Sequence, residues 1–261
     1  MLRKRLIFTL IYSNGNYMLS RNFRLQKVGN LDWLNKHYSF KDIAFSIDEL
    51  IVLDATKKEK DMDEFASSLP SLLKNIFVPV SIGGGIRSLE DAKVLFEKGA
   101  DKIVINTLLS SDVSTVKELV LMYGSQSIIA SIDFKFEANE IIVYIKDGEE
   151  KLDISFGEYL AYIKELNVGE IYLNSINKDG TGQGYEIEIL KPYLENITLP
   201  VILAGGAGNA KHLIEGINCK SVDAVATANL FNFIADGLPK AREEMIKCNI
   251  NLAPWENKWK L

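Results

Sequence analysis

The stretch VPVSIGGGIRSLEDAKVLFEKG, residues 78–99, contains one complete unit of the fold that the sequence predicts. An apolar strand is expected at 78–83, and a run of glycines ends it. A helix is expected at 88–99, because apolar residues recur there at three- and four-residue spacing. A continuous apolar strand followed by an amphipathic helix is typical of a parallel sheet that is covered by helices.

Seven further apolar runs extend this pattern along the chain. Eight strand–helix units predict a single-domain (β/α)8 TIM barrel over residues 1–261, with the barrel in 1–250 and a tail in 251–261. An extra hairpin is expected after the fifth strand, from the apolar run 141–145 and the turn 147–150. The other strands are expected at 5–11, 49–54, 102–106, 127–133, 170–175, 199–205 and 223–228, and a second helix at 155–167.

The chain also repeats itself at an offset of about 121 residues. Glycines end the strand in both VPVSIGGGI (78–86) and LPVILAGGA (199–207). We interpret the barrel as two fused halves of four units each, although any parallel barrel also makes its strands look alike. In this alignment Ile11 of the first half occupies the place of Asp133 in the second. The other aligned pairs are DELIVLD (48–54) with GEIYLNS (169–175) and RLIFTLI (5–11) with SIIASID (127–133).

The composition excludes several classes of function. With 30 Lys and Arg against 35 Asp and Glu, no basic excess exists to neutralise phosphates, so nucleic acid is not an expected partner. Cys219 and Cys248 are far apart, which predicts free thiols in a reducing cytoplasm and neither a metal site nor a cofactor. No apolar run reaches the roughly 18 residues of a membrane-spanning helix, so a soluble cytoplasmic protein is expected. In the tail, Trp255 and Trp259 would share a helix face if that segment is helical.

The candidate site lies at the carboxyl ends of the strands, where barrels of this class place their chemistry. The glycine runs IGGGIRS (82–88) and AGGAGN (204–209) can bind phosphate through backbone N–H groups and helix N-termini, or they simply make tight turns. The loop 177–184 adds polar residues, or it is a flexible lid without ligand contact. Asp54 and Asp133 each end a strand, and each could serve as a base or as a structural acceptor. The loop 177–184 contributes Asp179, Gly180 and Thr181, and the strands that follow the two glycine runs end in the small polar residues Asn106, Thr107, Thr227 and Asn229.

Four charged residues open strands at the opposite end of the predicted barrel. They are two cations and two anions, and they could converge as a neutral ring that closes the barrel bottom. From spacing alone they could equally be solvated rim charges or a structural cluster of ion pairs. These residues are Arg5, Glu49, Lys102 and Glu170.

Together these features resemble the cyclase subunit of imidazole glycerol phosphate synthase, a HisF-like barrel, over roughly residues 1–250. The segment with SINKDGTGQGY is the most distinctive part of the resemblance. The matching motifs are DELIVLD (48–54), IGGGIRSLEDA (82–92), GADKIVINT (99–107), YGSQSIIASID (123–133), GEIYLNSINKDGTGQGY (169–185) and ILAGGAG (202–208).

The resemblance implies a cyclase site that has lost half of its acid–base pair. In the family, aspartates at the ends of strands one and five act on a substrate with two phosphates; Asp133 matches the second, and the first falls on Ile11. A lysine of the loop after strand one falls on Leu19, and a serine after strand eight falls on Asn229. The implied phosphate-binding residues that match are Gly84, Asn106, Thr107, Asp179, Gly180 and Gly206.

The resemblance also implies a route for ammonia. In the family a glutaminase docks at the barrel bottom, and its ammonia enters the barrel through a gate of four charged residues. Arg5, Glu49, Lys102 and Glu170 match that gate, so the resemblance favours the ring interpretation, and Asp101 matches a residue that contacts the partner.

One branch of the family fits a chain in which all four gate residues match but only one of the two acid–base aspartates does. Its members accompany a glutaminase and a sugar amidotransferase in the amidation of N-acetyl sugars for O-antigen, capsule or flagellin glycans. The first hypothesis is therefore an ammonia-conducting subunit of such a complex. The second is a working cyclase of histidine biosynthesis that uses Asp133 with a substitute acid, and a third is a barrel with an unrelated phosphorylated substrate.

Overall fold

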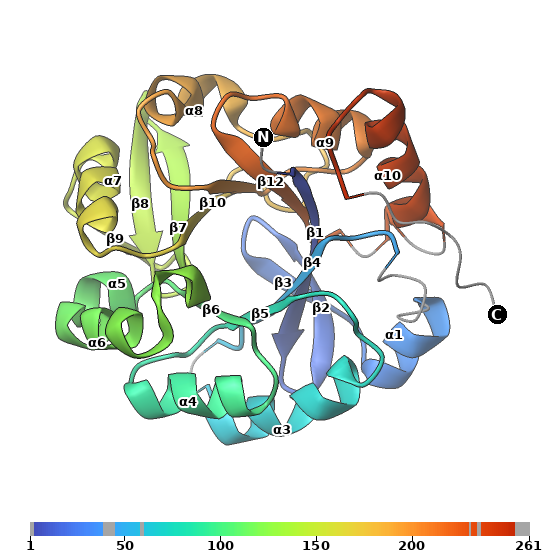
Figure 1. Ribbon diagram of the computed structural model, residues 1–261, viewed down its shortest axis with the longest axis horizontal. Coiled ribbons are helices and arrows are strands. Elements are labelled where there is room, and N and C mark those ends of the chain that lie inside the picture. The colour runs from blue at the N-terminus through green and yellow to red at the C-terminus, as the bar shows by residue number, and fades with distance from the viewer. Residues whose placement is uncertain (1–2, 39–44, 58–59, 230, 234–235, 254–261) are drawn as a thin grey trace.

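Eight parallel strands close into a barrel in the computed structural model, which describes residues 3–38, 45–57, 60–229, 231–233 and 236–253 (Figure 1). Pairing of the fifth strand with the sixth and of the eighth with the first completes the circle. This confirms the predicted (β/α)8 barrel; Trp255 and Trp259 lie outside the described residues. The barrel strands are β1 (Arg5–Ser13), β4 (Glu49–Asp54), β5 (Val80–Gly83), β6 (Lys102–Ile105), β7 (Ile128–Glu137), β10 (Glu170–Ser175), β11 (Val201–Ala204) and β12 (Val222–Thr227).

Helices surround the barrel, and serine caps begin both of the helices that the sequence predicted. Ser88 and Ser155 each accept the backbone N–H of the third helical residue, whose carboxylate accepts the serine N–H in return. These helices are α4 (Leu89–Glu97) and α7 (Phe156–Glu165). The others are α1 (Leu31–His37), α3 (Met62–Leu73), α5 (Leu108–Ser111), α6 (Val113–Tyr123), η1 (Ser125–Ser127), α8 (Ile187–Leu194), α9 (Ala210–Ile217) and α10 (Gly237–Lys247).

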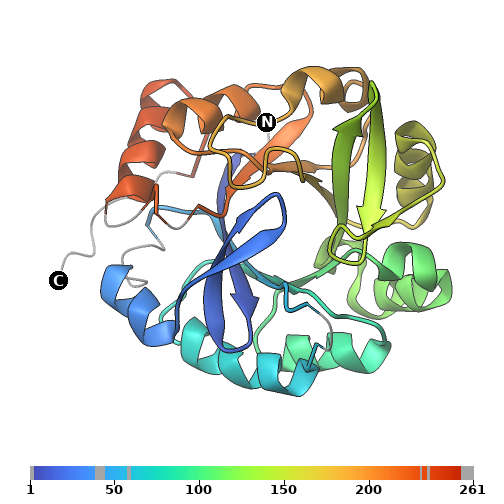
Figure 2. The same cartoon turned by 180° about the vertical axis from the view of Figure 1, so that it is seen from behind.

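Two hairpins interrupt the alternation of strands and helices. The predicted one follows β7 and contains β8 (Glu140–Ile145) and the short β9 (Glu150–Lys151). The other was not predicted: β2 (Asn16–Arg21) and β3 (Arg24–Gly29) follow β1, where the sequence indicated only a turn. Each hairpin follows the first strand of one half, so the second hairpin adds a structural counterpart to the sequence repeat. Figure 2 shows the blue β2–β3 hairpin lying across the end of the barrel.

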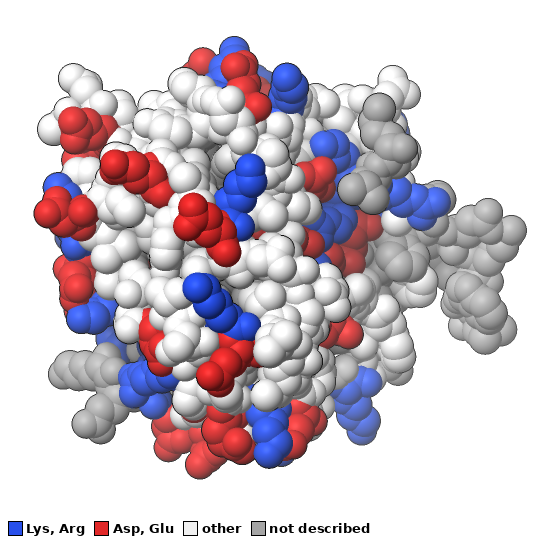
Figure 3. Space-filling view, turned by 60° about the vertical axis from the view of Figure 1, so that its left-hand side comes forward, with Lys and Arg blue, Asp and Glu red and all other residues white. Residues whose placement is uncertain are grey.

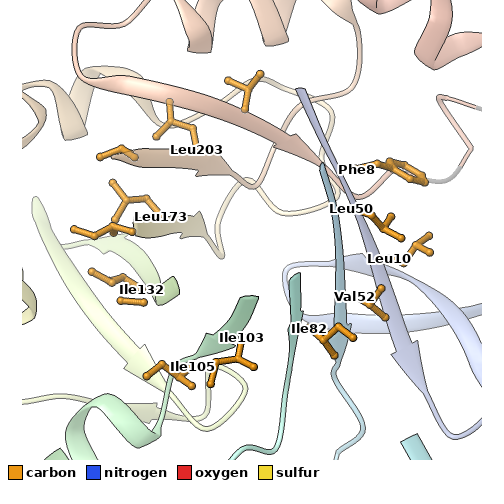
Figure 4. Packing of buried hydrophobic residues seen from close by; sticks show 14 of the residues in the cluster. Phe8, Leu10, Leu50, Val52, Ile82, Ile103, Ile105, Ile132, Leu173 and Leu203 are labelled. Atoms are coloured by element: carbon orange, nitrogen blue, oxygen red, sulfur yellow. The ribbon is translucent and has the colours of Figure 1, made fainter. Parts of the chain in front are cut away.

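The barrel strands separate the hydrophobic core into two parts. Alternate residues such as Phe8, Leu50 and Leu173 face the helices, and Figure 4 shows these outer residues around the strands. The residues between them face the barrel interior and form a second cluster. This inner cluster is Ile7, Ile51, Val104, Ile129, Tyr172, Ile202, Ala204, Ala224 and Ala226, with Leu53 packed against it.

A buried ion pair fastens the last helix to the barrel. Arg242 of α10 is 4 % exposed, and its two terminal nitrogens lie 2.9 Å from the two oxygens of Asp48. The same carboxylate accepts the backbone N–H of Leu6 at 2.8 Å, and Arg242 also donates to the carbonyl of Ala253. Arg242 thus joins the C-terminal segment to Asp48, which precedes β4 and also contacts β1.

The surface shows no sign of a nucleic-acid site on the face drawn in Figure 3. Acidic and basic side chains are interspersed there, without an extended area of one sign, in line with a net charge of −5. Within the described ranges, no helix is both long and apolar enough to cross a membrane.

Candidate functional site

A cavity of about 760 Å³ opens at the carboxyl ends of the barrel strands, a size that suits a small-molecule ligand. Hydrocarbon side chains such as Ile11 and Leu53 line it together with charged and amide groups. The six residues that match the family's phosphate-binding residues line this cavity, as do Asn229, which stands in place of a family serine, and Asp133. The seven candidate phosphate-binding residues are Gly84, Asn106, Thr107, Asp179, Gly180, Gly206 and Asn229.

Asp133 is a buried carboxyl group held by two amides. Asn174 donates its side-chain N–H to Oδ1 at 3.0 Å, and Asn106 donates to Oδ2 at 3.2 Å. Burial raises the pKa of Asp133 to about 7, although the bond from Asn174 favours the ionised form. A carboxyl with a pKa near neutrality can both give and take a proton, which is the property that a general acid or base requires.

Replacement of Asp133 by asparagine should stabilise the protein increasingly as the pH rises. The folded state keeps the Asp133 proton up to about pH 7, whereas an unfolded aspartate releases it near pH 3.9, so the free energy of unfolding of the wild type falls between those values. An asparagine side chain does not titrate, and the stability difference should grow across this window by as much as about 4 kcal/mol. Urea unfolding at pH 4.5 and pH 8 measures it. The exposed Asp153→Asn is the control, and an equal difference at both pH values for Asp133→Asn would contradict the burial effect.

The end of β1, where the resemblance places a second acid, carries a hydrocarbon side chain. Ile11 lines the cavity at the end of β1, beside Met18 on β2 and Leu53 on β4 in strand register. Leu19 lines the cavity as well. These side chains can neither donate nor accept a proton, so Asp133 has no acid–base partner at this strand end.

The other carboxylates that line the cavity all have structural partners. Asp54 accepts the N–H of Thr56 at 2.9 Å, which is consistent with a structural acceptor, and its role as a base stays a prediction. Asp112 accepts the N–H of Thr115 and so caps α6. The remaining ion pairs are Asp147 with Lys60, at 2.9 Å, and Glu149 with Lys57, at 3.9 Å. The sequence offered no signal for these contacts, which give each of these four carboxylates a partner within the protein.

Asp179 and Gly180 hold the β2–β3 hairpin over the cavity. The Asp179 carboxylate accepts the hydroxyl of Ser20 at 2.5 Å and the backbone N–H of Phe23 at 3.0 Å. Burial raises the pKa of Asp179. Gly180 has a φ of +67°, and a Cβ there would lie 1.9 Å from the carbonyl oxygen of Ser20. These contacts are a structural reason for both residues that does not depend on a phosphate.

The remaining predicted phosphate residues also have partners in the protein. The Thr107 hydroxyl accepts the backbone N–H of Lys146 at 3.1 Å, and Asn229 accepts the backbone N–H of Asn232 at 3.0 Å. A Cβ on Gly84 would lie 2.1 Å from the carbonyl oxygen of Asp54, and one on Gly206 would lie 2.0 Å from that of Gly184. Glycine is therefore required at both turns by close backbone approach, and phosphate binding there stays a prediction.

The four charged residues at the amino ends of the strands do converge as a ring. Arg5 lies 2.7 Å from Glu49 and 3.0 Å from Glu170, and Lys102 lies 3.2 Å and 2.9 Å from the same carboxylates. Burial alone would raise the pKa of Glu170, but Arg5 and Lys102 hold it below its usual value. Cation and anion alternate around the ring, so the barrel bottom is closed by ion pairs that share partners. Its role as a gate stays a prediction.

Asp101 has a structural role that the internal repeat duplicates. Its carboxylate accepts the backbone N–H of Val80 at 2.7 Å, at the start of β5. In the second half Asp223 accepts the N–H of Val201 in the same way, at 3.4 Å. An aspartate near the start of a strand thus has this structural role in both halves, and contact of Asp101 with a docked partner stays a prediction.

The fold and the site define a family of barrels, and comparison with known proteins identifies it. Residues 34–234 match the family model described as "Histidine biosynthesis protein". The chain is 44 % identical over 256 residues to a protein of Parasynechococcus marenigrum (strain WH8102) provisionally named imidazole glycerol phosphate synthase subunit hisF2, which covers 98 % of this chain and 95 % of the relative. It is 34 % identical over 233 residues to the imidazole glycerol phosphate synthase subunit HisF of an Exiguobacterium species, covering 89 % of each.

The chain therefore belongs to the histidine biosynthesis protein family, as a HisF-like barrel. A third relative, the HisF subunit of Pyrobaculum aerophilum, is 38 % identical over 186 residues, which are 71 % of this chain and 73 % of that one. The family resemblance deduced from the sequence is confirmed.

Proposed function

We propose that this chain is the barrel subunit of a glutamine-dependent amidating complex. A glutaminase docks at the face that carries the charged ring, and its ammonia passes through the ring into the barrel. The acceptor is an N-acetyl sugar bound by a separate amidotransferase of O-antigen, capsule or flagellin glycan synthesis. One observation carries the proposal: the ring is complete, while the cavity places Ile11 where a cyclase needs its second acid.

The geometry of the ring supports a passage that opens and closes. Each cation bridges both carboxylates, so one side chain can swing away while the other cation still holds Glu49 and Glu170 together. Ammonia is small and neutral, and it can pass such an opening without the desolvation cost of an ion.

A working cyclase is the second candidate function. The residues of the implied phosphate sites all line the cavity, and the pKa of Asp133 near 7 suits proton transfer. Against it, the other carboxylates of the cavity are engaged in structural contacts. Asp133 alone would then have to act as both the general acid and the general base of the cyclase reaction.

Reconstitution tests the proposed function. The chain, the glutaminase and the sugar amidotransferase encoded near it should together transfer the amide nitrogen of glutamine to an N-acetyl sugar. Omission of the chain should abolish transfer from glutamine while transfer from added ammonium continues. Glutamine-dependent amidation that does not need the chain would refute the proposal.

Opening the ring should uncouple the two reactions. Lys102→Met removes one of the two cations and leaves Arg5 alone between two carboxylates, so we expect several-fold less amidated sugar per glutamine hydrolysed. The readout is the ratio of amidated product to glutamate. Lys93→Met, which breaks the exposed pair of Lys93 with Glu90, is the matched control. An unchanged ratio in Lys102→Met would return the ring to a purely structural role.

A further inference from the structure

One strand carries three consecutive inward-facing polar groups from the bottom to the top of the barrel. On β10, Glu170 belongs to the charged ring and Asn174 donates to Asp133 in the cavity. Tyr172 lies between them, because alternate residues of a strand face the same side. It belongs to the inner cluster, whose other members are aliphatic.

The side chain of Tyr172 spans the barrel interior. Its hydroxyl lies 3.4 Å from the hydroxyl of Thr9 on β1. Strands β11 and β12 separate β10 from β1 around the barrel, so this contact crosses the lumen instead of joining neighbouring strands. Tyr172 is 3 % exposed, and burial raises the pKa of its hydroxyl, which therefore stays neutral.

The cavity ends at Tyr172. Among the described residues, its floor is lined by Tyr172 with Thr9, Val104, Ser131 and Ala226. The isoleucines of the inner cluster do not line it, and they are fully buried. In strand register Ile7 lies beside Glu49, Ile129 beside Glu170, and Ile202 beside Tyr172, so these buried isoleucines pack below the cavity, from the ring up to the tyrosine.

The internal repeat shows that packing alone does not require an aromatic side chain here. The place of Tyr172 in the second half is occupied by Ile51 in the first, and Ile51 is fully buried in the same inner cluster. The first half thus closes its side of the lumen with an aliphatic residue. The tyrosine adds a longer, planar side chain that reaches across to Thr9.

We propose that Tyr172 is a second closure of the barrel, above the charged ring, which separates the ring from the cavity until its side chain turns away from Thr9. That ammonia is what passes rests on the proposed function. With two closures in series, the cavity and the ring need not be open to each other at the same moment. When Tyr172 turns, its hydroxyl and that of Thr9 become free to accept hydrogen bonds from ammonia as it passes.

A buried thiol below Tyr172 can report whether the closure exists. Ser81 is 1 % exposed, lies beside Lys102 in register, and faces inward because Val80 and Ile82 face the helices. Ser81→Cys changes its volume little, and Cys219→Ser with Cys248→Ser removes the native thiols. The rate at which methyl methanethiosulfonate labels this thiol in the isolated barrel measures access from the cavity.

Tyr172→Ala should raise the labelling rate at least about tenfold, equivalent to about 1.4 kcal/mol. The control is Leu173→Ala, because Leu173 is the next residue of β10, is also buried, and faces the helices. Labelling that stays unchanged in Tyr172→Ala, or rises as much in Leu173→Ala, would overturn the closure. If Tyr172→Ala does not fold, Tyr172→Leu should still raise the rate several-fold, and no rise would be equally decisive.

Labelling and reconstitution fail independently of each other. The isolated barrel needs no glutaminase, so unchanged labelling overturns the closure while the amidating function still stands. Fast labelling of Tyr172→Ala together with amidation that does not need the chain would keep the closure and refute the function.

Discussion

With ammonium and the substrate of a HisF cyclase, this chain should turn over at least about 100-fold more slowly than a subunit that has both aspartates, because one positioned acid or base contributes about 10²–10⁴-fold. Ile11 provides no proton route at the end of β1, and the hydrogen bonds that the Asp133 carboxyl receives come from two amides, which do not exchange protons. Steady-state formation of the imidazole product at saturating ammonium measures the rate. A rate within about tenfold of such a subunit would favour the cyclase hypothesis.

Restoring the missing groups sharpens this experiment. Ile11→Asp with Leu19→Lys places an acid and a cation in the cavity that Asp133 also lines, and cyclase turnover should rise. Ile11→Asn with Leu19→Lys is the control, since it has a similar shape and polarity but cannot exchange a proton. If both double variants gain equally, the effect is one of polarity or space and not of acid–base chemistry.

The largest loss of stability is expected from Arg242→Met. The variant leaves the Asp48 carboxylate buried without its cation, and breaking a buried pair in this way costs about 3–5 kcal/mol. Urea unfolding monitored by circular dichroism measures it. Lys240→Met is the control, because Lys240 lies on the same helix and pairs with Asp236 at the exposed surface. It should leave the unfolding midpoint nearly unchanged.

A second substitution identifies the cause of that loss. Asp48→Asn removes the orphaned charge but keeps an oxygen for the backbone N–H of Leu6. In the Arg242→Met background it should therefore recover part of the lost stability. If it destabilises the protein further, packing of the Arg242 side chain would be responsible instead of the charge.

Most of the fold could be predicted because its signals are local. Continuous apolar runs such as 49–54 marked the barrel strands, and apolar residues at three- and four-residue spacing marked the helices at 88–99 and 155–167. The β2–β3 hairpin was missed because its strands are short, half-exposed and mixed in polarity. Its turn at Asn22 and Phe23 has positive φ at both positions, and phenylalanine is not a residue that normally signals this geometry.

For the site too, local sequence pattern predicted some features, and others depend on tertiary contacts. The sequence by itself determined the family, the order of the units, the hydrocarbon at Ile11 and the positions of the ring charges. Tertiary structure alone decided that the acidic residues of the cavity are engaged in structural contacts, and that Tyr172 meets Thr9 across the barrel. The physical reason is that strand periodicity sets which way a side chain points, whereas the residue it meets depends on how eight strands close and in which register.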